Sequence, residues 1–202
     1  MIIGLTGSIA SGKSTVSAML VEKEYPIVDA DLVARQVVQA GTETLAEIVA
    51  TFGEQALRKD GTMNRERVGE IIFNDPVSRK KLNDIIHPAI RREMLRQRDA
   101  LLAEGHPVVI MDIPLLFESK LQHFVDKVLV VSVTDENQLR RLMERNQFPE
   151  KEARARIASQ LPMSVKEQGA DAVIYNNGSL AETKGQLERI LEMWHALPRK
   201  ER

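Results

Sequence analysis

The sequence contains no cysteine in its 202 residues, which excludes disulfides, thiolate metal sites and a cysteine nucleophile. An excess of charge is also missing, because the formal net charge is −1 and no broad basic field attracts nucleic acid. No apolar run approaches the roughly 18 residues that a helix needs to span a bilayer, and the apolar opening stops at Gly7 without a basic start. We expect a cytoplasmic chain that binds neither nucleic acid nor membrane.

The remaining composition is that of a globular protein. A hydrophobic fraction of 43% and a charged fraction of 28% predict one sizeable folded core rather than a disordered chain. The sequence leaves the oligomeric state open, because neither a heptad pattern nor an obvious apolar patch decides it. A monomer is slightly favoured.

Short apolar runs predict a parallel sheet. They are rich in Val and Ile and are continuous rather than alternating, as in strands that helices cover on both faces. Helical patterns separate most of them, which indicates an α/β fold, a three-layer sandwich with a five-stranded parallel sheet. The predicted strands are residues 2–6, 26–30, 108–113, 127–133 and 171–177.

Two helical regions interrupt this alternation. Residues 31–105 lack a clear strand and are too long for a simple crossover, so they predict a helical insertion between core segments of about 1–30 and 106–202. Within the insertion, Pro88 is expected to break a helix, with His87 capping a new one that Pro88 begins. A second irregular helical region is expected at about residues 140–165.

The stretch "GSIASGKS" fits the pattern G-x-x-x-x-G-K-[ST], with Gly7, Gly12, Lys13 and Ser14 at the fixed positions. A predicted strand precedes it and a good helical pattern follows it. The glycines allow the backbone to close on an anion, and the helix N-terminus directs amides at phosphates. Lys13 would reach the β- and γ-phosphates, and the Ser14 hydroxyl would bind Mg²⁺. The alternative is a glycine-rich turn with a chance lysine.

Several classes of phosphate-loop protein fit the sequence poorly. A GTPase switch needs a guanine-reading N-K-x-D after a later strand, and the sequence has none. A motor ATPase needs a strand that ends in Asp-Glu, whereas Ile113 follows Asp112 here. The length, the helical excursions and the arginines favour a small kinase, which must exclude water so that the acceptor receives the phosphoryl group.

Two aspartates follow the second predicted strand, in "VDADLVAR". Ligands of open α/β sheets collect at the carboxyl ends of the strands, so Asp29 and Asp31 are expected near the phosphate loop. A carboxylate there can accept the proton of the acceptor hydroxyl or hold Mg²⁺ through water. Which of the two is the base stays open, and Asp31 is alternatively a helix N-cap worth about 1 kcal/mol. Arg35 either holds an acceptor phosphate or pairs with Asp31.

The motifs "GLTGSIASGKST", "VDADLVAR", "IIHPAIR", "DIPLLFE", "LRRLMERN", "RIASQ" and "VIYNNG" occur in this order. As an ordered set, from Ile2 to about Trp194, they resemble the dephospho-coenzyme A kinases. The resemblance implies transfer of the γ-phosphoryl group of ATP to the ribose 3′-hydroxyl of dephospho-coenzyme A, with Mg²⁺. It also implies a fold similar to that of nucleoside monophosphate kinases, with a core, a helical acceptor-binding domain and a lid.

Carried onto this sequence, the resemblance implies a nucleotide site and a catalytic set. Catalysis would depend on Lys13, on Asp31 as the base with Asp29 supporting it, and on Arg145. Ser14 would hold Mg²⁺ with water, and Asp31 or Asp112 would act on the ion through water. ATP would be bound by the loop and by the turn after the last strand, namely by Ala10, Ser11, Gly12, Lys13, Ser14, Thr15, Asn176 and Asn177.

The resemblance also implies an acceptor site. Its residues would come from the insertion, from the end of the central strand and from the lid: Asp29, Arg35, His87, Arg91, Asp112, Leu115, Arg141 and Arg156. Simpler interpretations remain open for some of them. His87 is equally a helix cap, Arg91 a solvated charge, and Arg141 and Arg145 partners of Glu144.

Two other functions compete with this interpretation. The first keeps the phosphate loop and changes the acceptor to another small metabolite or nucleotide. The second is a nucleotide-binding regulator without catalysis, against which the paired aspartates and the arginine-rich region argue.

Overall fold

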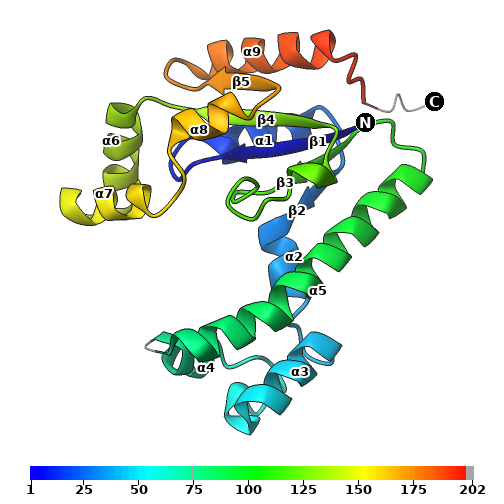
Figure 1. Cartoon of the computed structure of the whole chain (residues 1–202). Helices are drawn as coiled ribbons and strands as arrows, with labels where there is room; N and C mark the ends of the chain where they lie inside the picture. The colour runs from blue at the N-terminus through cyan, green and yellow to red at the C-terminus, as the bar shows by residue number, and fades with distance from the viewer. Residues whose placement is uncertain (74, 199–202) are drawn as a thin grey trace. The chain divides into compact units, whose positions relative to one another are not determined.

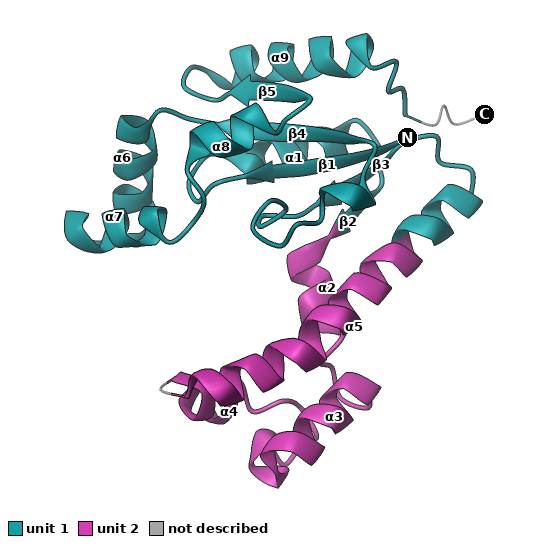
Figure 2. Cartoon of the chain, viewed as in Figure 1, with its two compact units in different colours: residues 1–28, 98–202 teal, residues 29–97 magenta. Residues whose placement is uncertain are grey.

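A computed structural model describes residues 1–73 and 75–198. The chain divides into two compact units, the first formed by residues 1–28 and the chain from residue 98 onward, the second by residues 29–97 (Figure 2). The second unit overlaps the predicted helical insertion at residues 31–105, although it begins two residues before it and ends before it does, and the first unit carries the sheet apart from Asp29 at the end of one strand. No helix in the described ranges combines the length and the hydrophobicity that a membrane span requires.

The sheet has five strands in the order β2-β3-β1-β4-β5 (Figure 1). β1 pairs in parallel with β3 and with β4, and β4 pairs in parallel with β5. Each strand falls within its predicted run, apart from Gly7, which extends the first strand by one residue. The strands are β1 (Ile2–Gly7), β2 (Ile27–Asp29), β3 (Val109–Asp112), β4 (Lys127–Ser132) and β5 (Ala172–Tyr175).

Helices cover the sheet on both faces, as the continuous apolar strands predict. Ile3 and Leu5 point to the face where helices α1 (Lys13–Glu22) and α9 (Leu180–Met193) pack and form the main core. On the opposite face, Ser132 donates a 2.5 Å hydrogen bond to Glu167 of α8 (Met163–Gln168). The structure is therefore a three-layer α/β sandwich, which confirms the predicted fold class.

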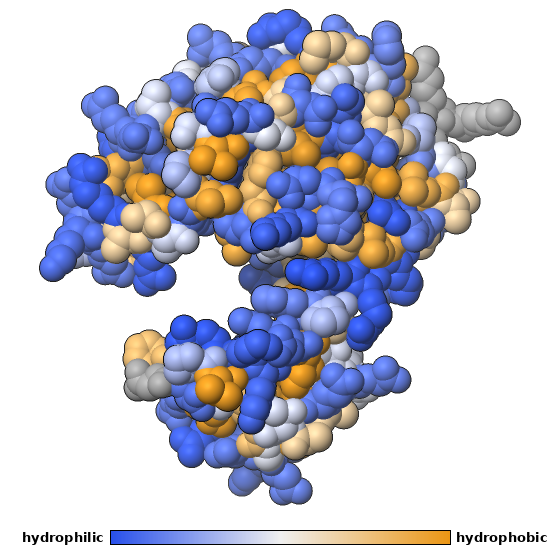
Figure 3. All heavy atoms as spheres, viewed as in Figure 1, coloured by the Kyte–Doolittle hydropathy of each residue, from blue (hydrophilic) through white to orange (hydrophobic). Residues whose placement is uncertain are grey.

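After β4 the chain forms a pair of packed helices, α6 (Asp135–Asn146) and α7 (Glu150–Ala158). This pair occupies most of the second irregular region predicted at residues 140–165. Hydrophilic residues crowd its outer end, at the left of the first unit in Figure 3. The α6–α7 segment, defined here as residues 135–160, accordingly buries few apolar side chains, among them Leu142 and Ala153.

The second unit consists mainly of helices. Three of its helices each bury an apolar side chain almost fully, namely Ile48, Val68 and Met94. The last helix runs on into the first unit. The helices are α2 (Ala30–Gln36), α3 (Glu43–Phe52), α4 (Arg65–Phe73) and α5 (Pro76–Ala103), and short 3-10 turns lie at Glu54–Ala56 here and at Gln122–Phe124 in the first unit.

The predicted helix break at Pro88 is wrong, because α5 continues through it. Proline removes one amide and crowds the preceding turn, but Pro88 and His87 are both exposed, so water can hydrate the carbonyl that loses its partner. A cap followed by proline occurs instead at the start of α5, at Asp75 and Pro76. Asp75 accepts hydrogen bonds from the Val77 amide at 2.9 Å and the Ser78 hydroxyl at 2.7 Å.

Because Pro88 lies inside a continuous helix, Pro88→Ala should raise the free energy of unfolding by about 1–3 kcal/mol by restoring an amide. The matched control is Pro76→Ala, where the first helical position needs no amide, and it should change stability by less than about 0.5 kcal/mol. Denaturant unfolding of both variants measures the difference. Equal effects, or a loss of stability at position 88, would contradict this account of the helix.

Candidate active site

The phosphate loop connects β1 to α1 through two residues in the left-handed conformation. Ala10 has φ 60° and Gly12 has φ 92°. The left-handed conformation costs an L-residue such as alanine roughly 1–2 kcal/mol, so the surroundings must hold Ala10 there. Gly12 caps α1, and the first amides of that helix have no partner inside the helix. These amides are the donors that an anion would meet.

Three amide side chains hold the backbone of this loop. Asn176 donates to the carbonyl of Ser11 at 2.9 Å, and Gln138 donates to the carbonyl of Ile9 at 2.8 Å. Gln160 accepts a hydrogen bond from the amide of Ile9 at 2.8 Å. The three come from the turn after β5, from α6 and from the chain after α7, so distant segments fix one short loop.

Close packing explains both glycines of the motif. A Cβ atom on Gly12 would lie 2.0 Å from Nδ2 of Asn176, and one on Gly7 would lie 2.5 Å from the Ser11 hydroxyl oxygen. Asn176 is one of the residues expected to bind ATP. The structure places its side chain against the loop through Nδ2, while Oδ1 accepts a 2.8 Å hydrogen bond from Thr183 of α9. Both ends of the amide therefore have partners, one in the loop and one in α9.

Asn177, also expected to bind ATP, joins the turn after β5 to the start of α6. Its Oδ1 accepts from the amide of Thr134 at 2.9 Å and from Nδ2 of Asn137 at 3.2 Å. Thr134 is the N-cap of α6. The turn is therefore tied to the α6–α7 segment rather than being a free Asn-Gly turn.

The structure brings Lys13 and Asp112 together. Asp112 ends β3, next to β1, and is only 4% exposed. The Lys13 ammonium, on the first turn of α1, forms an ion pair with its Oδ1. Ser14 is exposed beside it and Thr15 is half-buried. A buried carboxylate at the strand end thus neutralises the lysine that the motif directs at phosphates.

Of the predicted arginines, Arg141 approaches the loop. Its Nη1 lies 4.0 Å from where a Cβ atom on Gly12 would stand. Arg145, one turn later on α6, is exposed and donates to Oδ1 of Asn146 at 2.8 Å. The structure pairs Glu144 with Arg140 at 3.3 Å.

Arg156 lies on the surface of α7. It forms an ion pair of 3.4 Å with Glu152, and its guanidinium stands 5.5 Å from the centre of the Phe148 ring. Both contacts are local to the α6–α7 segment.

In the second unit, the helix cap falls on Asp29 instead of Asp31. Oδ1 of Asp29 accepts from the amides of Asp31 at 2.8 Å and Leu32 at 3.0 Å. The Asp31 carboxylate is exposed and has no hydrogen-bond or ion-pair partner in the described ranges, so the expected alternative pairing with Arg35 is absent there. His87 and Arg91 are exposed on α5, one turn apart.

After β3, the "PLLFE" stretch is mostly core. Leu116 and Phe117 are buried, whereas Leu115 is 43% exposed. Glu118 lies 2.8 Å from the fully buried Lys166 ammonium and accepts from the amide of Leu161 at 3.1 Å. Burial raises the pKa of Glu118, but the adjacent Lys166 and the peptide amides lower it by more, and the net pKa lies below the usual value.

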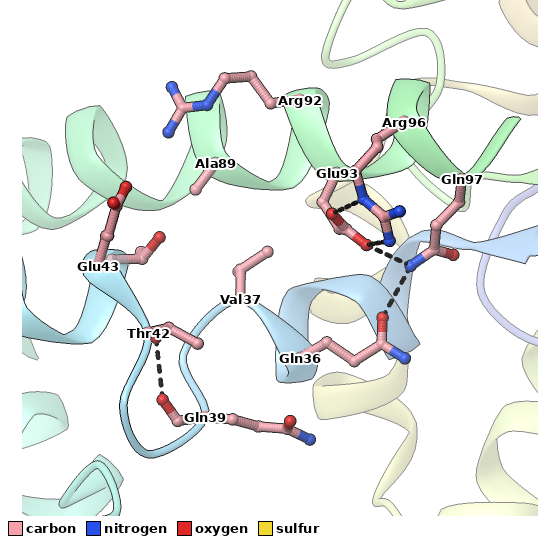
Figure 4. A pocket seen from close by; sticks show the side chains of 11 residues that line it. Gln36, Val37, Gln39, Thr42, Glu43, Ala89, Arg92, Glu93, Arg96 and Gln97 are labelled. Carbon is pink, nitrogen blue, oxygen red and sulfur yellow. Dashed lines mark hydrogen bonds and ion pairs between the residues drawn. The ribbon is translucent and has the colours of Figure 1, made fainter. Parts of the chain in front are cut away.

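A cavity of about 650 Å³ lies within the second unit (Figure 4). A chain of hydrogen bonds runs along it: Arg96 to Glu93 at 2.7 Å, Gln97 to Glu93 at 2.8 Å and Gln97 to Gln36 at 3.0 Å. The hydrogen bond from Arg96 lowers the pKa of Glu93 to about 2. None of the predicted acceptor residues lines this cavity, whose walls are Gln36, Val37, Gln39, Thr42, Glu43, Thr44, Ala89, Arg92, Glu93, Arg96 and Gln97.

Comparison with known proteins decides the family. The family model described as dephospho-CoA kinase matches residues 1–182. The chain belongs to the dephospho-CoA kinase family. The dephospho-CoA kinase of Geobacillus kaustophilus is 56% identical over 195 residues, which cover 96% of this chain and 97% of that protein.

Solved structures agree with this family. The dephospho-CoA kinase from Campylobacter jejuni has 30% sequence identity and a TM-score of 0.75, covering 96% of each chain. The shikimate kinase from Bacteroides thetaiotaomicron, at 18% identity and a TM-score of 0.52 over 96% of this chain and 98% of that one, shares the fold alone. The family is one of phosphotransferases, so the enzyme class predicted from the sequence is confirmed.

Sequence reasoning missed the two glutamines that hold Ile9, and also Lys166. The spacing of Gln160 four residues after Arg156 is visible in "RIASQ", but nothing local identifies its partner, which is 151 residues away. Gln138 is 2% exposed on α6, whose other buried residue is Leu142, and only the structure shows that the carbonyl Gln138 contacts belongs to the phosphate loop.

Gly12→Ala should weaken ATP binding by at least about tenfold, because the added Cβ displaces Asn176 and strains the loop. Gly41→Ala is the matched control, since Gly41 has φ 84° but no atom within 4 Å of its Cβ position. The control suffers similar backbone strain without the clash. Calorimetric titration with ATP compares the two variants, and unchanged affinity in Gly12→Ala would contradict the packing argument.

Proposed function

We propose that this chain transfers the γ-phosphoryl group of ATP to the ribose 3′-hydroxyl of dephospho-coenzyme A and releases coenzyme A and ADP, the last step of coenzyme A synthesis. The observation that carries the proposal is the match of residues 1–182 to the dephospho-CoA kinase family. The geometry of the phosphate loop supports the nucleotide half of the reaction, and the exposed Asp31 supports the acceptor half.

The loop supplies the phosphate site. Amides at the start of α1 and the positive end of the helix dipole would bind the β- and γ-phosphates. Lys13 already carries a carboxylate partner in Asp112, so the phosphates of ATP would compete with Asp112 for the same ammonium. Before ATP binds, the ion pair with Asp112 keeps the half-buried Lys13 ammonium near the site and compensates its charge.

The residues present fit a magnesium ion held mainly by ATP. In residues 1–73 and 75–198, no group of three or more His, Cys, Asp or Glu is placed to bind a metal. Mg²⁺ commonly takes only one or two protein oxygens and otherwise phosphate and water. Ser14 would supply the hydroxyl, and Asp31 or Asp112 would act through water. The ion would neutralise charge on the β- and γ-phosphate oxygens.

Asp31 is the proposed base, because Asp29 uses its carboxylate to cap α2. The 3′-oxygen forms a bond to the γ-phosphorus while the bond to the oxygen bridging the β- and γ-phosphates breaks, and ADP leaves. The proton of the 3′-hydroxyl passes to Asp31. Alignment of the hydroxyl is the larger part of this role, because phosphoryl transfer depends mainly on positioning and electrostatics.

The arginines and the second unit complete the proposal. Arg141, whose Nη1 lies close to Gly12, would neutralise phosphate charge, and Arg145 and Arg156 would join it when the α6–α7 segment moves toward the nucleotide and excludes water. Arg35, His87, Arg91 and Leu115 would contact dephospho-coenzyme A.

The purified chain should phosphorylate dephospho-coenzyme A in the presence of ATP and Mg²⁺, with the new phosphate on the ribose 3′-oxygen. Phosphorus NMR of the product locates the phosphate. Shikimate, AMP and adenosine, supplied under the same conditions, test other acceptors. Turnover on one of these and none on dephospho-coenzyme A would contradict the proposed substrate, and tight ATP binding without turnover on any of them would indicate a regulator.

Asp31→Asn should lower kcat by about 10²–10⁴-fold while leaving the affinity for ATP nearly unchanged, since it removes the proton acceptor only. Asp29→Asn is the matched control, because asparagine caps a helix about as well as aspartate. Steady-state kinetics and ATP titration of both variants separate the roles. The reverse pattern, with kcat lost in Asp29→Asn alone, would assign the base to Asp29.

A further inference from the structure

Two glutamines hold a single residue of the phosphate loop from opposite sides. Gln138 uses its Nε2 to donate to the carbonyl of Ile9, and Gln160 uses its Oε1 to accept from the amide of Ile9, each at 2.8 Å. A glutamine side chain offers one donor group and one acceptor. Each of these two presents the end that Ile9 requires, and together they engage both backbone groups of that residue.

The two glutamines mark the two ends of the α6–α7 segment. Gln138 lies in the first turns of α6 and is 2% exposed, and Gln160 is half-buried just after α7. The next residue, Leu161, is held in turn by Glu118, which pairs with the buried Lys166. Both ends of the segment are therefore fixed to the core beside the loop, while α6 and α7 project between them.

The residue held this way borders the strained part of the loop. Ala10, directly after Ile9, has φ 60°, and Ser11 after it is held through its carbonyl by Asn176. The left-handed residue thus lies between two anchored neighbours. Without the glutamines, Ala10 can relax to a more common conformation, and the amides that follow lose their shared direction toward the phosphates.

The same helix face carries the arginine that approaches the loop. Arg141 lies three residues after Gln138, so the two side chains are neighbours on α6. The hydrogen bond that seats Gln138 on Ile9 therefore also sets the position of Arg141, whose Nη1 is 4.0 Å from the Cβ position on Gly12. The buried side-chain amide of Gln138 therefore links the position of α6 to the shape of the loop.

We propose that Gln138 and Gln160 are positioning residues that couple the α6–α7 segment to the phosphate loop by holding Ile9 between them. When the segment moves, the glutamines move the Ile9 backbone, and when a nucleotide orders the loop, they restrain the segment. The inference goes beyond the proposed reaction and uses only the loop's role in binding phosphate.

The test exploits the opposite roles of the two ends of a glutamine. Gln160→Glu keeps the acceptor for the Ile9 amide, whereas the similarly sized Gln160→Met removes it. Gln138→Met removes the donor to the Ile9 carbonyl without placing a charge in a buried site. Gln168→Ala, at an exposed position on α8, controls for the loss of a glutamine elsewhere in the same unit.

Amide hydrogen exchange of the full chain without nucleotide should be at least about tenfold faster at Ile9 in Gln160→Met than in the wild type. Gln160→Glu should stay within about threefold of the wild type at the same amide. ATP affinity should fall by about tenfold in Gln138→Met and in Gln160→Met and stay unchanged in Gln168→Ala. Exchange elsewhere in the sheet should not change, which distinguishes loosening of the loop from general destabilisation.

The proposal would be overturned by wild-type exchange at Ile9 in Gln160→Met, or by wild-type ATP affinity in both methionine variants. It would also fail if Gln160→Glu exchanged as fast as Gln160→Met, because a residue that only fills space would make the two alike. A chain that shows the expected exchange pattern but does not phosphorylate dephospho-coenzyme A would contradict the proposed substrate and leave the coupling intact.

Discussion

The hydrogen bonds that hold the backbone of the phosphate loop are the interactions on which the rest of the site depends. Ala10 adopts a left-handed conformation that is costly for an L-residue, and Gly12 adopts one that glycine takes without this cost. The loop is held by Gln138, Gln160 and Asn176, each hydrogen-bonded to a backbone group of Ile9 or Ser11. Because the loop stands between β1 and α1, its shape decides where the first amides of α1 point.

The parallel sheet brings these groups together from distant parts of the sequence. β3 ends in Asp112, β1 leads into the phosphate loop, and β5 leads into the turn that carries Asn176, all at the carboxyl edge of one sheet. A chain with a net charge of −1 can therefore hold a highly charged nucleotide by local means. Lys13, Arg141 and oriented amides gather there, and the Asp112 carboxylate balances the lysine.

The sequence predicts the parts of the molecule whose signals are local. Continuous apolar runs locate the strands. The glycines of the loop stand at fixed positions of a recognisable motif, because a side chain at either position would clash with a nearby atom and Gly12 also has a left-handed conformation. Pro88 suggests a helix break, but at an exposed position water can hydrate the carbonyl that loses its amide partner, so the helix continues. The helix actually begins at Pro76, where Asp75 is the cap.

The rest of the site could not be predicted because it depends on contacts between distant residues. Gln138 lies 129 positions from Ile9, and an amide side chain carries no signature of the backbone group it will meet. The sequence likewise does not show which of Asp29 and Asp31 caps the helix, because both carboxylates occur at the end of the same strand. The structure shows that Asp29 is the cap. Asn176 looks like a turn residue in "YNNG" and proves to support the loop.

A crystal structure of the chain with dephospho-coenzyme A and a non-hydrolysable ATP analogue tests the account most directly. The account predicts the ribose 3′-oxygen within about 3 Å of the Asp31 carboxylate and in line with the γ-phosphorus. It also predicts that Gln138 and Gln160 still hold Ile9. A 3′-oxygen that faces a different base, or an Ile9 backbone released from both glutamines while the phosphates are bound, would contradict it.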